Sequence, residues 1–214
     1  MYGASVPGGH RERKRLQTRT LISDVATAMF FERGYQQTTI ADIAAAADVA
    51  KMTVTNYFPA KEDLAFDRAD DIVRLLADAV RERDPGAGVV TAVHEGYLRV
   101  LRDRDPIVDV LGRPFAELVG STPALQVRER ELYRSQEAAL AEVLVAEFAV
   151  SPVDLTPRMV AAWLAGTVHV LHVDGRRRLL AGGTPDAISR ALRTRAIHAF
   201  AALETAVPPA YRSS

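Results

Sequence analysis

Apolar residues return every three to four positions along most of the chain, whereas apolar–polar alternation with a period of two never persists. The three-to-four spacing is that of one face of an α-helix. Its first instance predicts a helix over residues 12–33, followed by Gly34, a residue type that easily adopts the left-handed conformation beyond a helix end. The apolar face of this helix consists of Leu21, Ile22, Val25, Ala26, Met29 and Phe30.

Two short helices and a longer one are predicted next. Thr39 is placed to cap the first of them. The expected elements are a helix over residues 40–47, a tight turn over 48–50, a second helix over 51–57 and a longer helix over 61–83. The segment Asp84-Pro85-Gly86 breaks the helical pattern strongly.

The rest of the chain contains four Asp-Pro or Thr-Pro pairs, in which a capping oxygen precedes a proline suited to the first helical position. They are Asp105-Pro106, Thr122-Pro123, Thr156-Pro157 and Thr184-Pro185. With the apolar periodicity they predict helices over 89–102, 123–149, 157–181 and 185–206, and a short irregular pair over 106–119. Gly182-Gly183 ends the penultimate helix, and Gly175 inside it is a weak point and a candidate kink. An all-α fold of about nine helices is therefore expected.

Composition narrows the class of protein. The 214 residues are 48% hydrophobic and 25% charged, which is typical of a soluble globular protein with a sizeable core. Cysteine is absent, which excludes disulfides, thiolate zinc sites and cysteine nucleophiles and fits a reducing compartment. Charges interrupt every apolar stretch before the roughly 18 residues of a membrane span, and residues 1–10 lack a signal-peptide pattern. We expect a cytoplasmic protein with no membrane partner and a flexible N-terminal tail over residues 1–10.

Positive and negative charges are equal in number over the whole chain, but they are unevenly distributed along it. The formal net charge is zero, which argues weakly against non-specific coating of phosphates. Between positions 11 and 19, however, one acid, Glu12, accompanies five basic residues: Arg11, Arg13, Lys14, Arg15 and Arg19. This run is either a solvated helix start or a basic arm near phosphate. Arginine far outnumbers lysine and alanine is abundant, which is typical of a GC-rich genome.

Residues 38–61 have the arrangement of a helix-turn-helix: two short helices with a three-residue turn between them. The inward positions are apolar or small, namely Ile40, Ile43, Ala44, Val49, Val54 and Phe58. The outward positions of the second helix are Lys51, Thr53, Thr55, Asn56 and Tyr57. Short donors and acceptors with one long cation can meet base edges and phosphates in a major groove.

The flanks of this motif make it more specific. Residues 18–66 resemble the tetracycline-repressor (TetR) family in four landmarks: a FxERGY-like helix end at 30–35, TTI-x-DIA at 38–44, TxxxYF at 53–58 and KEDL at 61–64. The resemblance covers about a quarter of the chain; the remainder is similar to the family only in length and helical content. Asp48 stands where the family usually has glycine in the turn, and Asp tolerates the left-handed region better than most residues.

The resemblance implies a DNA-binding domain over 11–75, with its motif at 38–57, and a ligand-binding and dimerisation domain over 76–214. It implies a repressor that binds a double-stranded inverted-repeat operator as a homodimer and is released by a small apolar or amphipathic effector. Expected DNA contacts are Thr39, Ala41, Lys51, Met52, Thr53, Thr55, Asn56, Tyr57 and Lys61, with Tyr57 and Lys61 on phosphate. Two of these have a plainer alternative: Tyr57 as a core aromatic residue and Met52 as a solvent-facing filler. Glu62 and Asp63 are interpreted as favourable helix N-terminal charges.

The C-terminal half offers candidates for two further roles, with ordinary core packing as the alternative for each. Candidate pocket residues are His94, Tyr97, Phe115, Tyr133, Trp163 and His169. Candidate interface residues are Val160, Leu164, Val168, Leu171, Leu192 and Phe200, and the resemblance implies that the last two long helices pair with those of a second copy.

Other classes of function find little support. His169 and His172 have a spacing that could hold a metal, but no third ligand is evident, so neither a metal nor a cofactor is expected. The chain lacks a GxSxG elbow, a P-loop, a GxGxxG turn and an HExxH helix, so we expect no enzyme. An adaptor protein that kept the helix-turn-helix without regulated DNA binding remains an alternative, favoured mildly by Asp48 and the zero net charge.

Overall fold

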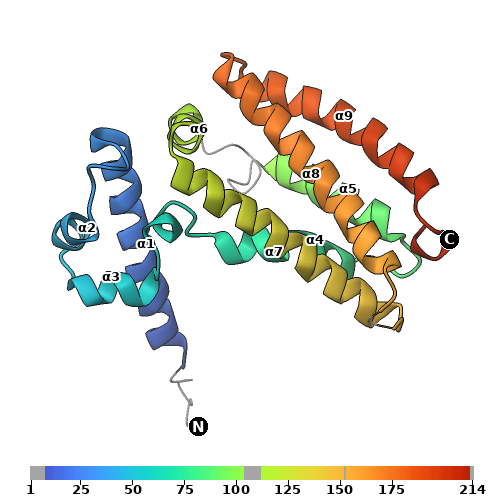
Figure 1. Ribbon diagram of the computed structural model, residues 1–214, viewed down its shortest axis with the longest axis horizontal. Coiled ribbons are helices and arrows are strands. Elements are labelled where there is room, and N and C mark those ends of the chain that lie inside the picture. The colour runs from blue at the N-terminus through green and yellow to red at the C-terminus, as the bar shows by residue number, and fades with distance from the viewer. Residues whose placement is uncertain (1–7, 104–111, 152, 213–214) are drawn as a thin grey trace, which may run out of the picture. The chain divides into compact units, whose positions relative to one another are not determined.

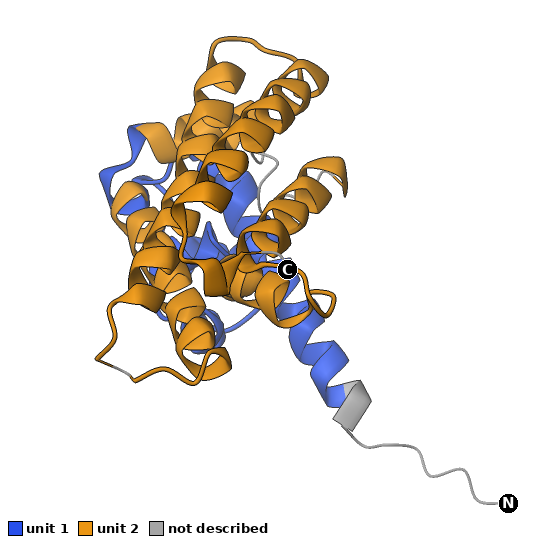
Figure 2. Cartoon of the chain, turned by 90° about the vertical axis from the view of Figure 1, so that its right-hand side faces the viewer, with its two compact units in different colours: residues 1–67, 121–125 blue, residues 68–120, 126–214 orange. Residues whose placement is uncertain are grey.

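The computed structural model describes residues 8–103, 112–151 and 153–212. Within those ranges the chain forms nine α-helices and two short 3₁₀-helices and has no strand, which confirms the predicted all-α class (Figure 1). The chain separates into two compact units, one ending at Asp67 and also containing Ser121–Leu125, the other made of Arg68–Gly120 and Gln126–Ser214 (Figure 2). The predicted domain boundary at 75/76 stays a prediction, because compactness alone divides the chain after Asp67.

The first unit is built from α1 (Gly8–Arg33), α2 (Ile40–Ala46), α3 (Lys51–Tyr57) and η1 (Lys61–Leu64). Its fully buried side chains include Ile22, Phe30, Ile43, Val54, Phe58 and Leu64. The first helix begins at Gly8 rather than at the predicted residue 12. The flexible tail expected over 1–10 stays a prediction, and 1–7 lie outside the described residues. Gly34 follows α1 at φ 84°, in the left-handed conformation expected of it.

The prediction of one long helix over residues 61–83 is wrong. The chain instead forms η1, leaves helical geometry, and begins α4 (Ala69–Arg81). The cause lies in Leu64, Ala65 and Phe66, which are all buried. Successive residues of a continuous helix point in directions 100° apart, so three in a row cannot all face one core. Burying all three requires the irregular turn that separates η1 from α4.

The second unit contains α4, α5 (Val89–Asp103), α8 (Thr156–Leu180), α9 (Pro185–Ala206), η2 (Pro209–Tyr211) and most of α6 (Gly112–Ser121) and α7 (Pro123–Glu147). Apolar residues of α4, α5, α7, α8 and α9 share one core with Tyr211 of η2, and its largest side chains are Tyr97, Tyr211 and Phe200. The helices predicted over 89–102, 123–149, 157–181 and 185–206 are confirmed to within two residues at each end. Of the irregular pair predicted over 106–119, the structure describes α6 only, since 104–111 lie outside the described residues.

Helix ends in this unit follow local chemistry, with one correction. Thr184 caps α9, its hydroxyl accepting from the N–H of Ala187 at 3.4 Å. Thr156 does not cap α8: it is the first residue of the helix, and its N–H donates to Asp154 Oδ1 at 2.8 Å. An aspartate two residues earlier has thus replaced the predicted cap.

Gly175 lies in α8, which continues through it without interruption to Leu180. A Cβ built at position 175 would lie 3.0 Å from Cδ1 of Leu192 on α9. The glycine is therefore explained by the close approach of α8 and α9 at this point, which a larger residue would obstruct.

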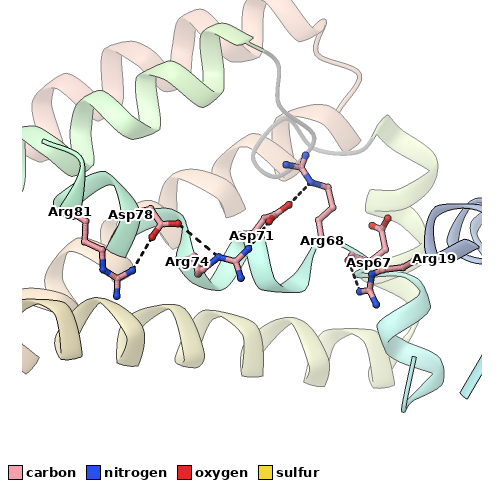
Figure 3. A network of polar contacts seen from close by, with 7 residues as sticks. All are labelled: Arg19, Asp67, Arg68, Asp71, Arg74, Asp78 and Arg81. Carbon is pink, nitrogen blue, oxygen red and sulfur yellow. Dashed lines mark hydrogen bonds and ion pairs between the residues drawn. The ribbon is translucent and has the colours of Figure 1, made fainter. Parts of the chain in front are cut away.

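The exposed face of α4 carries a ladder of opposite charges (Figure 3). Asp71 pairs with Arg68 and with Arg74, both at 3.0 Å, and Asp78 pairs with Arg81 at 2.9 Å. All five side chains are strongly exposed, so each pair contributes only a few tenths of a kcal/mol to the helix. In the described ranges, no helix has the length and apolarity that a membrane span needs.

Candidate functional site

The motif region forms two short helices that cross at a tight turn. Asp48 adopts φ 52° in this turn, so the left-handed conformation expected from the usual glycine is confirmed with an aspartate in its place. The turn is closed by the N–H of Val49, which donates to the main-chain oxygen of Ala44 at 3.0 Å. Ile43 and Val54 face the core of the unit and fix how α2 and α3 cross. The outer face of α3 is thereby held in one orientation.

The outer face of α3 is polar and accessible within the first unit. Lys51, Met52 and Asn56 are exposed, Met52 to 69%. The side chains of Thr53, Thr55 and Tyr57 are partly exposed, so Tyr57 is not the core aromatic residue of the alternative interpretation. Phe58, interpreted as a core residue, is fully buried.

The first short helix contributes Thr39 and Ala41, both exposed. The hydroxyl of Thr39 is engaged at the start of α2, where it accepts from the N–H of Asp42 at 3.2 Å. A phosphate contact by Thr39 would therefore share an atom that already caps the helix. Contacts of all these residues with DNA stay predictions.

Lys61 differs from its predicted setting. Its ammonium donates to the main-chain oxygen of Tyr35 and lies 4.0 Å from the centre of the Tyr35 ring. Burial lowers the pKa of Lys61, and the neighbouring Glu62 opposes that shift. η1 is a single 3₁₀ turn rather than the start of a long helix, and a phosphate contact by Lys61 stays a prediction. Asp63 has the expected N-terminal role, since its Oδ2 accepts from the N–H of Ala60 at 3.0 Å.

The basic run divides into two parts. Arg11, Arg13, Lys14 and Arg15 are exposed, as either interpretation of the run requires. Arg19 instead turns into the unit, where it donates to the main-chain oxygens of Tyr57 at 2.9 Å and of Asp67 at 2.8 Å. Sequence analysis missed this role. The signal was its register, because Arg19 precedes Ile22, Ala26 and Phe30 at helical spacing and so lies on the inward face of α1.

Four of the six candidate pocket residues combine burial with polar groups. Tyr97 is 1% exposed, and within the described residues no partner contacts its hydroxyl, Nε2 of His94 or Nδ1 of His169. Tyr133 packs edge-on against His169, with ring centres 4.3 Å apart. Burial lowers the pKa of both His94 and His169, so both imidazoles are neutral at pH 7. Buried polar atoms without partners are unusual in native proteins and are satisfied by water or a ligand where space exists.

A charged cluster on α7 and α8 lies beside Tyr133 and His169. Glu129 pairs with Arg176, and Nε2 of His172 lies 3.9 Å from Oε1 of Glu129. Burial first, and the charge of Arg176 second, lower the pKa of His172 to about 3. Because Glu129 and Arg176 neutralise each other, this part of the unit carries no excess charge at neutral pH.

The two remaining pocket candidates have different settings. Phe115 is buried on α6. Trp163 is 37% exposed and lines an open groove along α8 and α9, and its place in an effector pocket stays a prediction. Apolar neighbours on one helix could not show which face the ring occupies.

The predicted interface residues also need correction. Val160, Leu164, Val168, Leu171, Leu192 and Phe200 are each at most 4% exposed and belong to the core of a single chain. Side chains without exposed area cannot bury more of it against a second copy. The accessible apolar side chains of these helices are instead Trp163, Val170, Val173 and Ile197.

Some of these accessible side chains border a groove of about 550 Å³ on the surface of α8 and α9. It is lined by Ala162, Trp163, Gly166, Thr167, Val170, Leu171, Arg195, Ala199 and Leu203. Leu171 thus lies at the groove although it is almost fully buried. Small residues beside exposed large ones are suited to receive another helix.

Comparison with known proteins gives the same picture. Residues 22–67 match the family described as bacterial regulatory proteins, tetR family. The HTH-type transcriptional regulator TcmR of Streptomyces glaucescens is 29% identical over 72% of this chain and 71% of its own length. The HTH-type transcriptional repressor LfrR of Mycolicibacterium smegmatis is 33% identical over half of this chain and 54% of its own length. A solved SmeT–triclosan complex has the same fold, with a TM-score of 0.57, 18% identity, and coverage of 90% of this chain and 93% of that one.

Proposed function

We propose that this chain, which belongs to the TetR family of transcriptional regulators, is a repressor that binds an inverted-repeat operator as a homodimer and leaves it when a small effector binds. The observation that carries the proposal is the exposed polar face of α3, held outward by the buried Val54. In a helix-turn-helix protein this face enters the major groove. A two-fold dimer would present two such helices about 34 Å apart, one turn of DNA.

Roles within the surface follow from side-chain chemistry. Lys51, Thr53 and Asn56 can reach base edges, whereas the Tyr57 hydroxyl at the C-terminal end of α3 suits a phosphate oxygen. Base contacts set sequence preference, and phosphate contacts set affinity without distinguishing sequences. Replacing a base-contacting residue should therefore change sequence preference, whereas replacing a phosphate-contacting residue should change affinity alone.

Dimerisation is assigned to the groove of α8 and α9. Trp163 and Val170 expose apolar surface there, which a second copy of the same helices would cover. Of the six residues that sequence periodicity suggested, Leu171 lines this groove and the other five do not. The pairing of the last two helices stays as proposed.

The effector site is assigned to the surroundings of His94, Tyr97, Tyr133 and His169. Neutral imidazoles, a buried hydroxyl without a partner and the internally balanced Glu129–Arg176 pair favour an uncharged ligand. A neutral, mostly apolar molecule with one or two hydrogen-bonding groups fits this environment. Its binding would favour the dimer arrangement that cannot hold both half-sites, which releases the operator.

The test of DNA binding is selection of an operator from random DNA by the purified wild-type protein. The expected result is an inverted repeat whose retention survives moderate salt. Thr53→Ala should change the preferred bases, and Tyr57→Phe should weaken binding uniformly by about 1 kcal/mol, the net value of one hydrogen bond. Thr194→Ala, at an exposed position on α9, is the matched control and should change neither property. Selection that yields no common sequence, with the protein folded, would favour the adaptor interpretation.

The effector site is tested by thermal shift with a panel of neutral aromatic and amphipathic compounds. A compound that raises the melting temperature should also release the operator. Tyr97→Phe, which removes only the unpartnered hydroxyl, should reduce that shift while leaving operator affinity unchanged. If no compound that binds weakens operator binding, release by an effector is wrong while the DNA-binding assignment stands.

A further inference from the structure

Arg19 connects two parts of the first unit that lie far apart in sequence. Its Nη1 donates to the main-chain oxygen of Tyr57 at 2.9 Å. Its Nη2 donates to the main-chain oxygen of Asp67 at 2.8 Å, a contact drawn in Figure 3. The guanidinium also lies over the ring of Phe58, 4.4 Å from its centre. One side chain from α1 therefore contacts Tyr57, Phe58 and Asp67, which follow the helix-turn-helix or lie at its end.

Each acceptor has a distinct place in the fold. Tyr57 is the last residue of α3, and its carbonyl is one of those that a helix leaves without an internal partner. A cation at that end is also favoured by the helix dipole. Asp67 is the last residue of the N-terminal segment of the first compact unit, two positions before α4 begins. Arg19 thus fixes the end of α3 and the point where the chain leaves the unit.

The geometry of the side chain makes this connection stiff. A guanidinium is planar, and its donors form a rigid fork, so it sets the separation and direction of the two carbonyls together. Phe58 is fully buried and supports one face of that plane. A lysine keeps the charge but provides one rotatable ammonium without a planar face.

We propose that Arg19 is a positioning residue that couples the chain exit at Asp67 to the orientation of α3, so that the distance between half-sites is sensed through this side chain. The proposal rests on the proposed function, since it needs a dimer on an inverted repeat. A displacement at Asp67 is carried to Tyr57 through two hydrogen bonds on one rigid plane. In this role the two terminal nitrogens of Arg19 hold main-chain oxygens, and the protein's phosphate contacts come from other side chains.

The experiment compares wild type with Arg19→Lys on three operators: the selected one and versions with one base pair added to or removed from the centre. Wild type is expected to bind the selected operator much more tightly than the two versions with altered spacing. Arg19→Lys is expected to lose at least about fivefold of that discrimination, the lower end of typical coupling between sites. The matched control is Arg15→Lys on the same helix, whose side chain is exposed and lies 3.6 Å from Glu12. It should behave as wild type.

This readout separates positioning from simple loss of stability. A partly unfolded variant binds all three operators less well by the same factor, so the ratio of affinities does not change. Unchanged spacer discrimination in Arg19→Lys would therefore overturn the proposal. If Arg19→Lys fails to fold, the same comparison is made with Arg19→Gln, whose amide can donate to a single carbonyl. Reduced spacer discrimination is again the expected result, and unchanged discrimination again overturns the proposal.

A second variant tests the phosphate alternative. Arg19→Met removes the charge, and a lost phosphate contact would reduce the slope of log affinity against log salt by about 0.9. Positioning predicts an unchanged slope together with reduced spacer discrimination, and a reduced slope overturns it. Failure of wild type to select any inverted repeat would overturn the proposed function itself and this inference with it, an outcome visible before any variant is made.

Discussion

Thr39 and Asp42 close the first turn of α2 in both directions. The N–H of Asp42 donates to Thr39 Oγ1 at 3.2 Å, and the N–H of Thr39 donates to Asp42 Oδ2 at 2.9 Å. The Thr39 hydroxyl, which also donates to Asp42 Oδ2 at 2.6 Å, and then the Thr39 N–H lower the pKa of Asp42 below its ordinary value. The reciprocal pair satisfies two main-chain donors at the edge of the candidate DNA-binding surface.

Replacing Thr39 should therefore destabilise the first unit. Thr39→Ala removes the capping oxygen and is expected to lower the free energy of unfolding by about 1 kcal/mol. Thr39→Ser keeps the oxygen and should stay within about 0.5 kcal/mol of wild type. Urea unfolding followed by circular dichroism measures both, and equal stability of the two variants would show that the cap contributes nothing.

Asp48 makes an independent prediction about the turn between α2 and α3. Its φ of 52° is a region in which a side chain costs about 1–2 kcal/mol, less for Asp than for most residues. Asp48→Gly should raise stability by up to about 1 kcal/mol, and Asp48→Val should lower it by at least that amount, since β-branched residues tolerate this region worst. Asp48→Asn is the matched control and should be nearly neutral. A Val variant as stable as wild type would contradict the strained turn.

The buried His172 predicts a specific dependence of stability on pH. Burial holds its folded pKa at about 3, whereas in the unfolded chain histidine titrates near 6.5. As pH falls below about 6.5 the unfolded chain takes up the proton first, so stability declines, by up to about 1.4 kcal/mol per pH unit for this one group. Above that pH its contribution is complete.

The variant His172→Gln should flatten this acid decline. Unfolding free energies measured in urea between pH 7 and 4 would then fall less steeply than in wild type, whatever the variant's stability at pH 7. Burial lowers the pKa of His169 as well, so His169 contributes to the loss of stability at low pH in both proteins. The variant should therefore reduce the decline without abolishing it. His198→Gln, at an exposed position on α9, should leave the slope as it is. Parallel curves for wild type and His172→Gln would be incompatible with a neutral buried His172.

The sequence could predict what depends on local pattern. Most helix positions follow from apolar periodicity, the helix over 61–83 excepted. The left-handed conformation of Asp48 follows from the glycine that the resembling family usually has at this turn position. The outward set of α3 could be predicted because Val54 and Phe58 identify its inward face, and both are fully buried. These inferences needed no knowledge of distant parts of the chain.

The sequence could not predict the features that depend on which neighbouring element packs against each face of a helix. In α8, Val168 is buried and Val170 is exposed, although both lie in the same apolar stretch. A helix with apolar residues on more than one face has no local signal that separates core from surface. The main-chain partners of Arg19 were hidden for a similar reason, because carbonyl oxygens are present at every position and leave no trace in the sequence.

Val168 and Val170 also give the sharpest test of the dimer surface. Val170 is 66% exposed beside the groove of α8 and α9, and Val168 is in the core two residues away. Val170→Asp places a charge on the proposed interface without burying it in the monomer. The expected result is a folded monomer by light scattering, with the helix content of wild type and at least tenfold weaker operator binding, because one half-site alone is held.

Val168→Asp is the matched variant and should behave differently. A carboxylate in the core without a partner costs several kcal/mol, so this protein is expected to lose its cooperative unfolding transition rather than only its dimer. Wild-type protein should in addition show a melting temperature that rises with concentration, as linked folding and association require, and Val170→Asp should not. A Val170→Asp protein that remains a dimer would place the interface elsewhere, and the groove at Trp163 would then need another occupant.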